Sequence, residues 1–158
     1  MSPIPKQVHS GTSAVLERRH DLYAVRQSTG ATAKDAVTVL GDDTRVAFAV
    51  YRGDPPEGHK AEDVGPVYSA GPDGPIAVPT GRVFVRLTEG VKPEERRQQF
   101  EAAGFHIEQT LSYAPNAAWL RPTTGGVNHA LPAIATLEKL DDVVHVEPQL
   151  LFDRQFKK

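Results

Sequence analysis

The chain has 158 residues, enough for one medium domain or two small ones. Its formal net charge is −2, from 18 basic and 20 acidic residues, so it lacks the basic excess typical of a nucleic-acid-binding protein. It has no cysteine, which excludes disulfides, thiol nucleophiles and thiolate metal sites.

The beginning of the chain, Met1–Gln7, lacks the apolar core of a signal peptide. No other stretch is apolar for long enough to span a membrane. We therefore expect a cytoplasmic protein whose partners are neither nucleic acids nor membranes. An extracellular location stays open if the chain is an excised leader.

The first part of the chain, residues 1–52, has the alternation of apolar residues that is typical of β-strands. Ser13–Arg18 and Asp21–Arg26 flank a two-residue polar turn, which predicts a β-hairpin. Ala36–Leu40 and Arg45–Tyr51 are separated by glycine and aspartate residues, which predicts a second pair of strands. We expect a small β-rich part here.

Prolines and glycines are concentrated in residues 53–80. Proline removes a backbone hydrogen-bond donor and glycine favours turns, so regular structure cannot continue for long there. The sequence predicts an irregular connection that holds two short extended pieces, Val67–Ser69 and Ile76–Val78.

The last part, residues 81–152, alternates strand and helix patterns. The first helix, Lys92–Ala103, has proline in its first turn and Gly104 after its end, both typical of helix boundaries. The second helix is expected to begin at 128–131, with Pro132 in its first turn and a stripe of leucine and isoleucine. The expected strands are Arg82–Leu87, Phe105–Gln109, Ala117–Arg121 and one around Val143–Val146.

The predicted order of these elements is β-α-β-β-α-β. This order is typical of a ferredoxin-like sandwich, in which two helices cover one face of an antiparallel sheet. The predicted fold class is therefore α+β, with a ferredoxin-like module preceded by the β-rich part.

The other face of such a sheet is left open. Because side chains alternate along a strand, Val83, Val85 and Leu87 would face the helices, while Phe84 and Arg86 would face outward with Arg82. An exposed apolar surface of this kind usually marks a binding site. The alternative is that the β-rich part folds over this face and makes it ordinary core.

The same alternation places side chains of the other strands. Val144 and Val146 would face the helices, whereas Val143 and His145 would face outward. On the third strand, either Trp119 or its neighbour Leu120 must point outward.

Three stretches of residues 81–152 resemble the propeptides of subtilisin-like serine proteases. They are the first strand with its turn, Val83–Gly90, the central stretch Tyr113–Leu120, and the final helix running into Leu140–Pro148. The segment Asp142–Pro148, Asp-Val-Val-His-Val-Glu-Pro, is the most specific of these. Residues 1–80 look similar to the β-rich leader that precedes this module in some bacterial subtilases. No protease domain follows in this chain, so it would be either an excised leader or a free-standing inhibitor.

The resemblance implies an inhibitor and folding chaperone of a subtilisin-like protease. The open sheet face would dock on two parallel surface helices of the protease. Glu147 would lie at the N-termini of those helices, where backbone donors favour a carboxylate. A tail, Gln149–Lys158, would run extended through the substrate cleft, with Gln155 or Lys158 at the specificity pocket. The expected contact residues are Phe84, Arg86, Trp119, Val143, His145, Glu147, Leu150, Leu151, Phe152, Gln155 and Lys158.

The sequence offers no convincing catalytic set. Gly11–Ala14 resembles the start of the subtilase nucleophile motif, but no histidine and carboxylate precede it in the order that such a site requires. The six histidines are scattered singly, without the spacing of a zinc site. We expect no enzyme activity, no metal and no cofactor. The main alternative function is an interaction or regulatory domain that does not inhibit a protease.

Overall fold

The computed structural model describes residues 7–9, 15–27, 36–41, 47–54, 64–71, 74–123 and 126–152. The chain divides into two compact units. Unit 1 comprises Gly81–Gln149, and unit 2 comprises Pro5–Thr80 together with Leu150–Lys158. Two long strands, β8 (Ile76–Leu87) and β11 (Val143–Phe152), contribute residues to both units.

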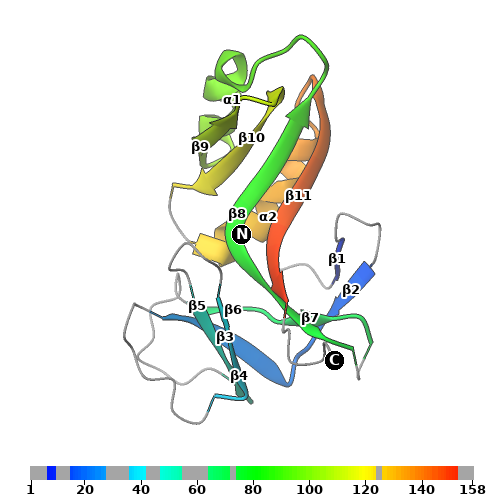
Figure 1. Ribbon diagram of the computed structural model, residues 1–158, viewed down its shortest axis with the longest axis vertical. Helices are drawn as coiled ribbons and strands as arrows, with labels where there is room; N and C mark the ends of the chain where they lie inside the picture. The colour runs from blue at the N-terminus through cyan, green and yellow to red at the C-terminus, as the bar shows by residue number, and fades with distance from the viewer. Residues whose placement is uncertain are drawn as a thin grey trace. The chain divides into compact units, whose positions relative to one another are not determined.

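Unit 1 contains residues of four strands of a seven-stranded sheet, and two short helices. In the sheet, β10 pairs antiparallel with both β8 and β9, and β11 pairs with β8. Both helices lie on the same face of this sheet (Figure 1). After β8, the elements are a 3-10 turn (Pro93–Arg96), α1 (Arg97–Ala102), β9 (Phe105–Leu111), β10 (Ala114–Pro122), α2 (Gly126–Glu138) and β11.

The core of unit 1 lies between the sheet and the helices. Val83, Val85 and Leu87 are fully buried there, which confirms that these residues of β8 face the helices. Each such side chain contributes roughly 1.5–3 kcal/mol when it leaves water. Leu120 is also fully buried, so Trp119 is the residue of β10 that points to the opposite face. The helices supply Phe100, Ala130 and Leu137.

The first helix ends where the sequence predicts, although its first turn is 3-10 rather than α-helical. Gly104 follows α1 with φ +91°, a conformation that favours glycine. A Cβ atom at this position would also overlap the imidazole ring of His129, which would have to move. Both the backbone conformation and the position of this ring therefore favour glycine here.

The second helix begins earlier than predicted. It begins at Gly126, so Pro132 lies inside the helix and not in its first turn. A proline there has no N–H to donate to the carbonyl of Asn128. The packing of Ala130, Leu131 and Leu137 on the helix's buried side compensates for this loss.

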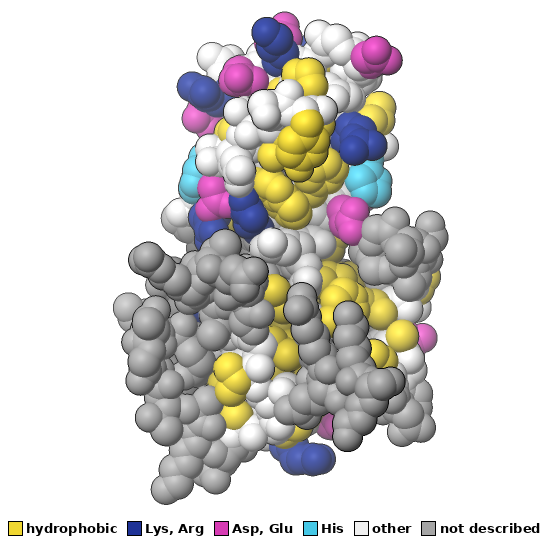
Figure 2. Space-filling view, in the orientation of Figure 1, with side chains coloured by type: hydrophobic (Ala, Val, Ile, Leu, Met, Phe, Trp, Pro, Cys, Tyr) yellow, Lys and Arg dark blue, Asp and Glu magenta, His cyan; other side chains and the backbone are white. Residues whose placement is uncertain are grey.

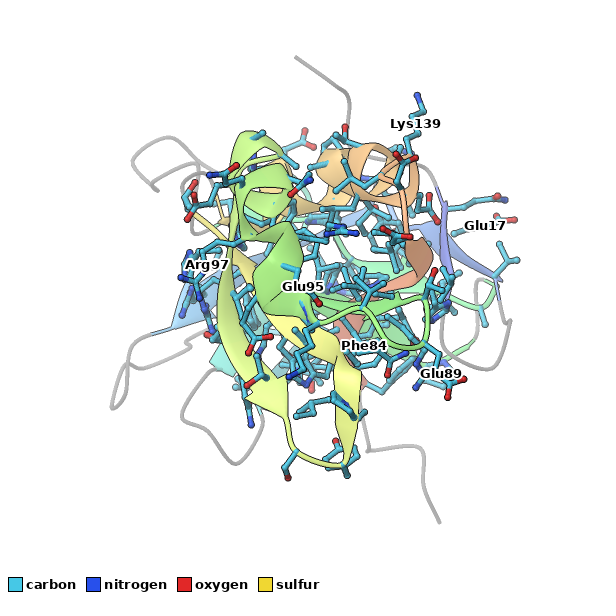
Figure 3. The ribbon with its side chains drawn as sticks, turned by 90° about the horizontal axis from the view of Figure 1, so that it is seen from above. Glu17, Phe84, Glu89, Glu95, Arg97 and Lys139 are labelled. Atoms are coloured by element: carbon cyan, nitrogen blue, oxygen red, sulfur yellow. The ribbon has the colours of Figure 1, made fainter. Side chains whose placement is uncertain are left out.

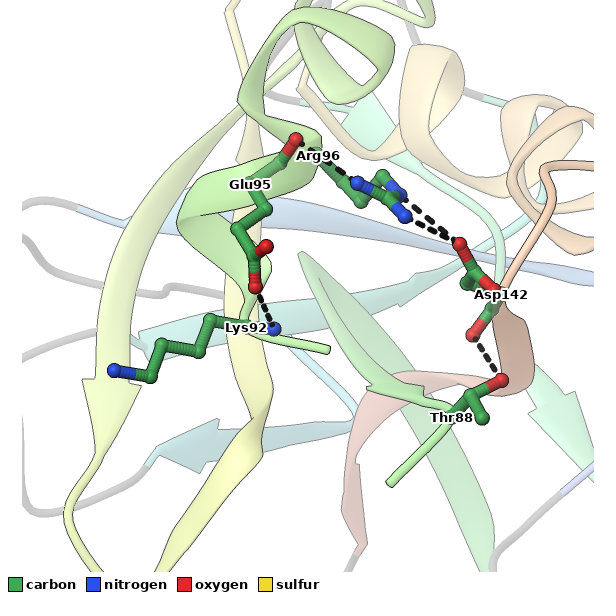
Figure 4. Close-up of polar contacts among 5 residues, drawn as sticks. All are labelled: Thr88, Lys92, Glu95, Arg96 and Asp142. Atoms are coloured by element: carbon green, nitrogen blue, oxygen red, sulfur yellow. Dashed lines mark hydrogen bonds and ion pairs between the residues drawn. The ribbon is translucent and has the colours of Figure 1, made fainter. Parts of the chain in front are cut away.

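A polar contact joins the start of the α1 region to the entry of β11. Arg96 donates from Nε to Oδ2 of Asp142 (3.2 Å), and the backbone N–H of Thr88 donates to the Asp142 carbonyl (2.7 Å). Figure 4 shows these residues together with the Lys92 N–H, which donates to the Glu95 carboxylate (2.9 Å). Asp142 has φ +70°, so these contacts hold the chain in an uncommon backbone conformation just before β11.

The described residues of unit 2 form strands and the turns between them. The first part of β8 pairs with β7 (Tyr68–Ser69), which continues through β2 (Val15–Arg18) to β1 (Gln7–His9). A second sheet has the order β4-β5-β3-β6. Its strands are β4 (Thr38–Gly41), β5 (Ala47–Arg52), β3 (Leu22–Gln27) and β6 (Val64–Gly65).

The β-rich part departs from the prediction in one pairing. The expected pair β4–β5 is present, but β2 and β3 do not form a hairpin because they belong to different sheets. The chain changes sheet at the polar turn between them, where the Arg19 N–H donates to the Val67 carbonyl and not across a hairpin. Apolar alternation predicts a strand, but it does not identify the neighbouring strand.

Residues 53–80 form part of unit 2 and not a connection between two domains. The predicted extended pieces coincide with β7 and the beginning of β8. Val67, Ile76 and Val78 are buried in a core shared with Leu22 and Phe48. The prolines and glycines shorten the strands, but the apolar residues between them still pack.

The described residues therefore form an α+β protein, rich in sheet, with two short helices. Among the residues that the structure describes, no helix has the length and apolarity needed to cross a membrane.

Candidate functional site

The open face of the unit 1 sheet carries a cluster of aromatic and basic side chains, which we call the aromatic patch. Its members are Arg82, Phe84 and Arg86 from β8, Trp119 from β10 and His145 from β11. Trp119 lies directly opposite Phe84 in the β8–β10 register, and their rings meet edge to face with centroids 5.3 Å apart. Figure 2 shows an apolar surface on this face, bordered by basic and histidine side chains.

Arg82 is held over the indole ring of Trp119. Its guanidinium carbon lies 4.5 Å from the ring centroid, which is the geometry of a cation–π contact. Glu108 forms ion pairs with both Arg82 and Arg121, and Gln109 accepts a hydrogen bond from Arg82 (2.8 Å). Burial raises the pKa of Glu108, but the hydrogen bonds from the two arginines outweigh it and lower the pKa below 4.5.

Arg86 lies over the ring of Phe84, with its guanidinium carbon 5.7 Å from the centroid. Unlike Arg82, it forms no ion pair with any residue that the structure describes. Its side chain is exposed, so it presents an uncompensated positive charge beside an aromatic ring.

His145 closes the patch on the β11 side. Its ring lies 6.5 Å from Phe84, and its Nε2 lies 3.1 Å from Oε2 of Glu147. Glu147 is two residues further along the strand and half-buried. The Glu147 carboxylate therefore already has a neighbour on its own strand.

The predicted orientation of two valines was wrong. Val143 packs against the unit 1 core and does not belong to the open face, whereas Val144 is 61% exposed. The reason is the turn after α2, in which the Val143 N–H donates to the Leu140 carbonyl (3.3 Å). Val143 is thus the first residue of β11, directly after this turn, and its side chain packs against the core while Val144 and His145 are exposed.

A hollow of about 460 Å³ adjoins the patch at the end of the sheet where β8 ends and the β9–β10 turn lies. We call it the end hollow. The Asn116 side chain braces this end by donating to the Leu87 carbonyl (2.7 Å). Tyr113 is 83% exposed beside it. Residues that line the hollow include Arg86, Glu89, Lys92, Tyr113, Pro115 and Asn116.

Three of the expected tail residues belong to a strand. Leu150, Leu151 and Phe152 lie in β11 and belong to unit 2, where Leu151 packs against the core. The accessible tail therefore cannot begin at Gln149, as expected, because β-structure and apolar packing fix the chain up to Phe152. Gln155 and Lys158 lie outside the described residues.

The structure brings together four of the expected contact residues, namely Phe84, Arg86, Trp119 and His145, with Glu147 attached through His145. The sequence did not predict that Arg82 stacks on Trp119, although its outward orientation was expected. It also gave no role to Tyr113. An exposed tyrosine in a tight turn is the signal that was available.

Comparison of the chain with protein-family models, with curated proteins and with solved structures gives no match. Within the described part of the chain, no group of three or more histidine, aspartate or glutamate side chains is placed to hold a metal ion.

Proposed function

We propose that the protein is a propeptide-like inhibitor and folding chaperone of a subtilisin-like serine protease, which docks through the aromatic patch. The observation that carries this proposal is the Phe84–Trp119 pair, rimmed by Arg82, Arg86 and His145 on the sheet face opposite α1 and α2. Tryptophan and arginine are the residues that most often dominate binding energy at protein interfaces. A binding function thus explains this composition better than catalysis does.

We further propose that unit 1 is a ferredoxin-like module. Two observations support this: the element order β8-α1-β9-β10-α2-β11, and the strand order β11-β8-β10-β9 with both helices on one face. In such a module the uncovered face is available to a partner. Fold alone does not specify the partner, which is inferred from the propeptide resemblance.

The cleft-binding segment in this proposal is Asp153–Lys158. Since Leu151 contributes to the unit 2 core, the residues up to Phe152 stay with the inhibitor. The following residues would enter the substrate cleft by adding a strand to the enzyme. Gln155 and Lys158 are then the candidates for the specificity pocket.

The docking proposal is tested with a subtilisin-like protease and the full chain. Phe84→Ala should weaken inhibition by about 10- to 100-fold, as expected for the loss of a central aromatic residue. The single tryptophan, Trp119, reports binding by its intrinsic fluorescence in the same variant. Val39→Ala, at an exposed apolar position of unit 2, is the control and should leave inhibition unchanged. No inhibition by the unmodified chain would reject the proposal.

An interaction domain that does not inhibit a protease is the alternative. The packing of Leu151 in the unit 2 core favours it, because a tail fixed up to Phe152 leaves only a short segment for the cleft. Removal of residues 153–158 separates the two functions. An inhibitor should lose inhibition but keep its fluorescence response to the protease, whereas full inhibition by the truncated chain would contradict the tail mechanism.

A further inference from the structure

The end hollow is flanked by two cations without ionic partners. Arg86 and Lys92 both line it, both are exposed, and neither forms an ion pair with a described residue. Figure 4 shows the ammonium end of Lys92 directed away from Glu95, whose carboxylate accepts from the Lys92 backbone instead. Three other basic residues of unit 1, Arg82, Arg96 and Arg121, form ion pairs with Glu108 or Asp142.

The rest of the hollow is mostly apolar. Val91, Tyr113 and Pro115 contribute to its lining, and Phe84 lies next to it under the Arg86 guanidinium. Its volume falls in the range of about 300–1,000 Å³ that is typical of ligand sites. A ligand that fits must therefore combine one negative charge with apolar surface.

We propose that the end hollow binds one acidic side chain of an extended segment of the partner protein, flanked by apolar residues that contact Tyr113 and Phe84. The carboxylate would lie between the guanidinium of Arg86 and the ammonium of Lys92, which are matched to it in charge. Glu89 also lines the hollow, and its negative charge disfavours a run of several acidic residues. The identity of the partner as a protease rests on the proposed function, but the preferred peptide chemistry does not.

The test uses the full chain and two peptides of equal size, acetyl-Leu-Glu-Leu-amide and acetyl-Leu-Gln-Leu-amide. Binding is followed by ¹H–¹⁵N NMR on the side-chain amide of Asn116 and the backbone amides of residues 86–92, 113, 114 and 116. The glutamate peptide should bind about tenfold more tightly than the glutamine peptide. Its affinity should also fall as NaCl is raised from about 50 to about 500 mM, because exposed charges are screened.

Two double variants separate the site from general charge effects. Arg86→Gln with Lys92→Gln should remove the preference for the glutamate peptide. Arg97→Gln with Lys139→Gln removes the same charge from exposed positions of unit 1 and should preserve that preference. Figure 3 shows Phe84 and Glu89 toward one side of unit 1, with Arg97 and Lys139 away from them.

Equal binding of the two peptides by the unmodified chain would overturn the proposal, as would an equal loss in both double variants. The substituted side chains are exposed, so circular dichroism should show an unchanged fold. A glutamate preference without protease inhibition would support the end hollow while rejecting the proposed function. Protease inhibition without a preference for the glutamate peptide would support the proposed function while rejecting the end hollow as a binding site.

Discussion

Glu108 organises the aromatic patch although it is not part of it. It pairs with Arg82, which lies over Trp119, and with Arg121 on β10. A cation over an indole ring contributes roughly 0.5–2 kcal/mol, but an arginine side chain loses conformational entropy when it is held there. The ion pair reduces the freedom of Arg82 before any partner arrives, so a partner meets a partly preorganised surface.

Replacement of Glu108 by glutamine should make the free energy of unfolding less dependent on pH in the acid range. Its folded-state pKa lies below 4.5, so the ionised form stabilises the fold above that pH, and the contribution is lost as the pH falls through the folded-state pKa. At pH 7, Glu108→Gln should lower the free energy of unfolding by about 1 kcal/mol. Urea unfolding at pH 7 and at about pH 3 measures both values.

The difference between wild type and Glu108→Gln should shrink at the acid pH. A difference of the same size at both pH values would mean that the carboxylate charge contributes nothing. Glu101→Gln, at an exposed position of α1, is a suitable control because it removes a similar charge outside any ion pair that the structure describes.

At the scale of elements, the end of α1 is fixed by one residue in two ways. Gly104 has φ +91°, and the His129 ring of α2 occupies the space where a side chain would be. The ring also lies 5.9 Å from that of Phe105, so His129 joins α2 to the first residue of β9. The glycine thus permits both the turn and the close approach of the second helix.

Gly104→Ala should destabilise the protein more than Gly90→Ala. Both glycines have φ near +90°, but a Cβ atom at Gly90 would meet nothing within 4 Å. We expect roughly 1 kcal/mol for the backbone strain alone and about 1–3 kcal/mol more for the overlap at Gly104. Thermal unfolding of the two variants measures the difference.

Shortening His129 should remove the second part of this cost. In Gly104→Ala with His129→Ala, the added methyl group has space, so its effect should approach that of Gly90→Ala. Equal losses in Gly104→Ala and Gly90→Ala would show that the overlap is relieved by a small movement of the ring.

The sequence predicts the regular parts of the unit 1 strands and helices better than their ends. Val83, Val85 and Leu87 have a strict two-residue period in a strand that is buried on one side, and all three were oriented correctly. Val143 was not, because its N–H is hydrogen-bonded back to the Leu140 carbonyl where the turn after α2 enters β11, and such a contact leaves no periodic pattern. Pro132 was placed too near the helix start because packing overrides a local preference.

The sequence predicts less well which strands pair with one another. The apolar alternation of β2 and β3 indicates strands, but their membership of different sheets depends on pairing with residues beyond position 60. The candidate site has the same limit. Phe84 and Trp119 were expected on the open face, whereas the end hollow arises where two separate turns meet, and neither turn carries a motif for it.

At the scale of the whole molecule, the apolar residues near the end of β11 have unequal roles. Leu151 packs on the unit 2 core, whereas Phe152 is 43% exposed. Leu151→Asp places a charge against that core, which costs several kcal/mol unless the group becomes neutral. Alternation along the strand explains why adjacent residues differ.

Leu151→Asp should therefore lower the free energy of unfolding by about 2–4 kcal/mol, and Phe152→Asp by less than about 1 kcal/mol. Guanidinium unfolding with circular dichroism measures both. Similar values for the two variants would mean that the strand end is not part of the core, and a tail starting at Gln149 would then be restored as a hypothesis.

The inclusion of Leu151 in the unit 2 core also has a consequence for biosynthesis. A ribosome completes every residue of Gly81–Gln149 before it adds the leucine that packs against the other core. The unit 2 core, although most of its residues are made first, therefore gains this contact only after Gly81–Gln149 has been synthesised.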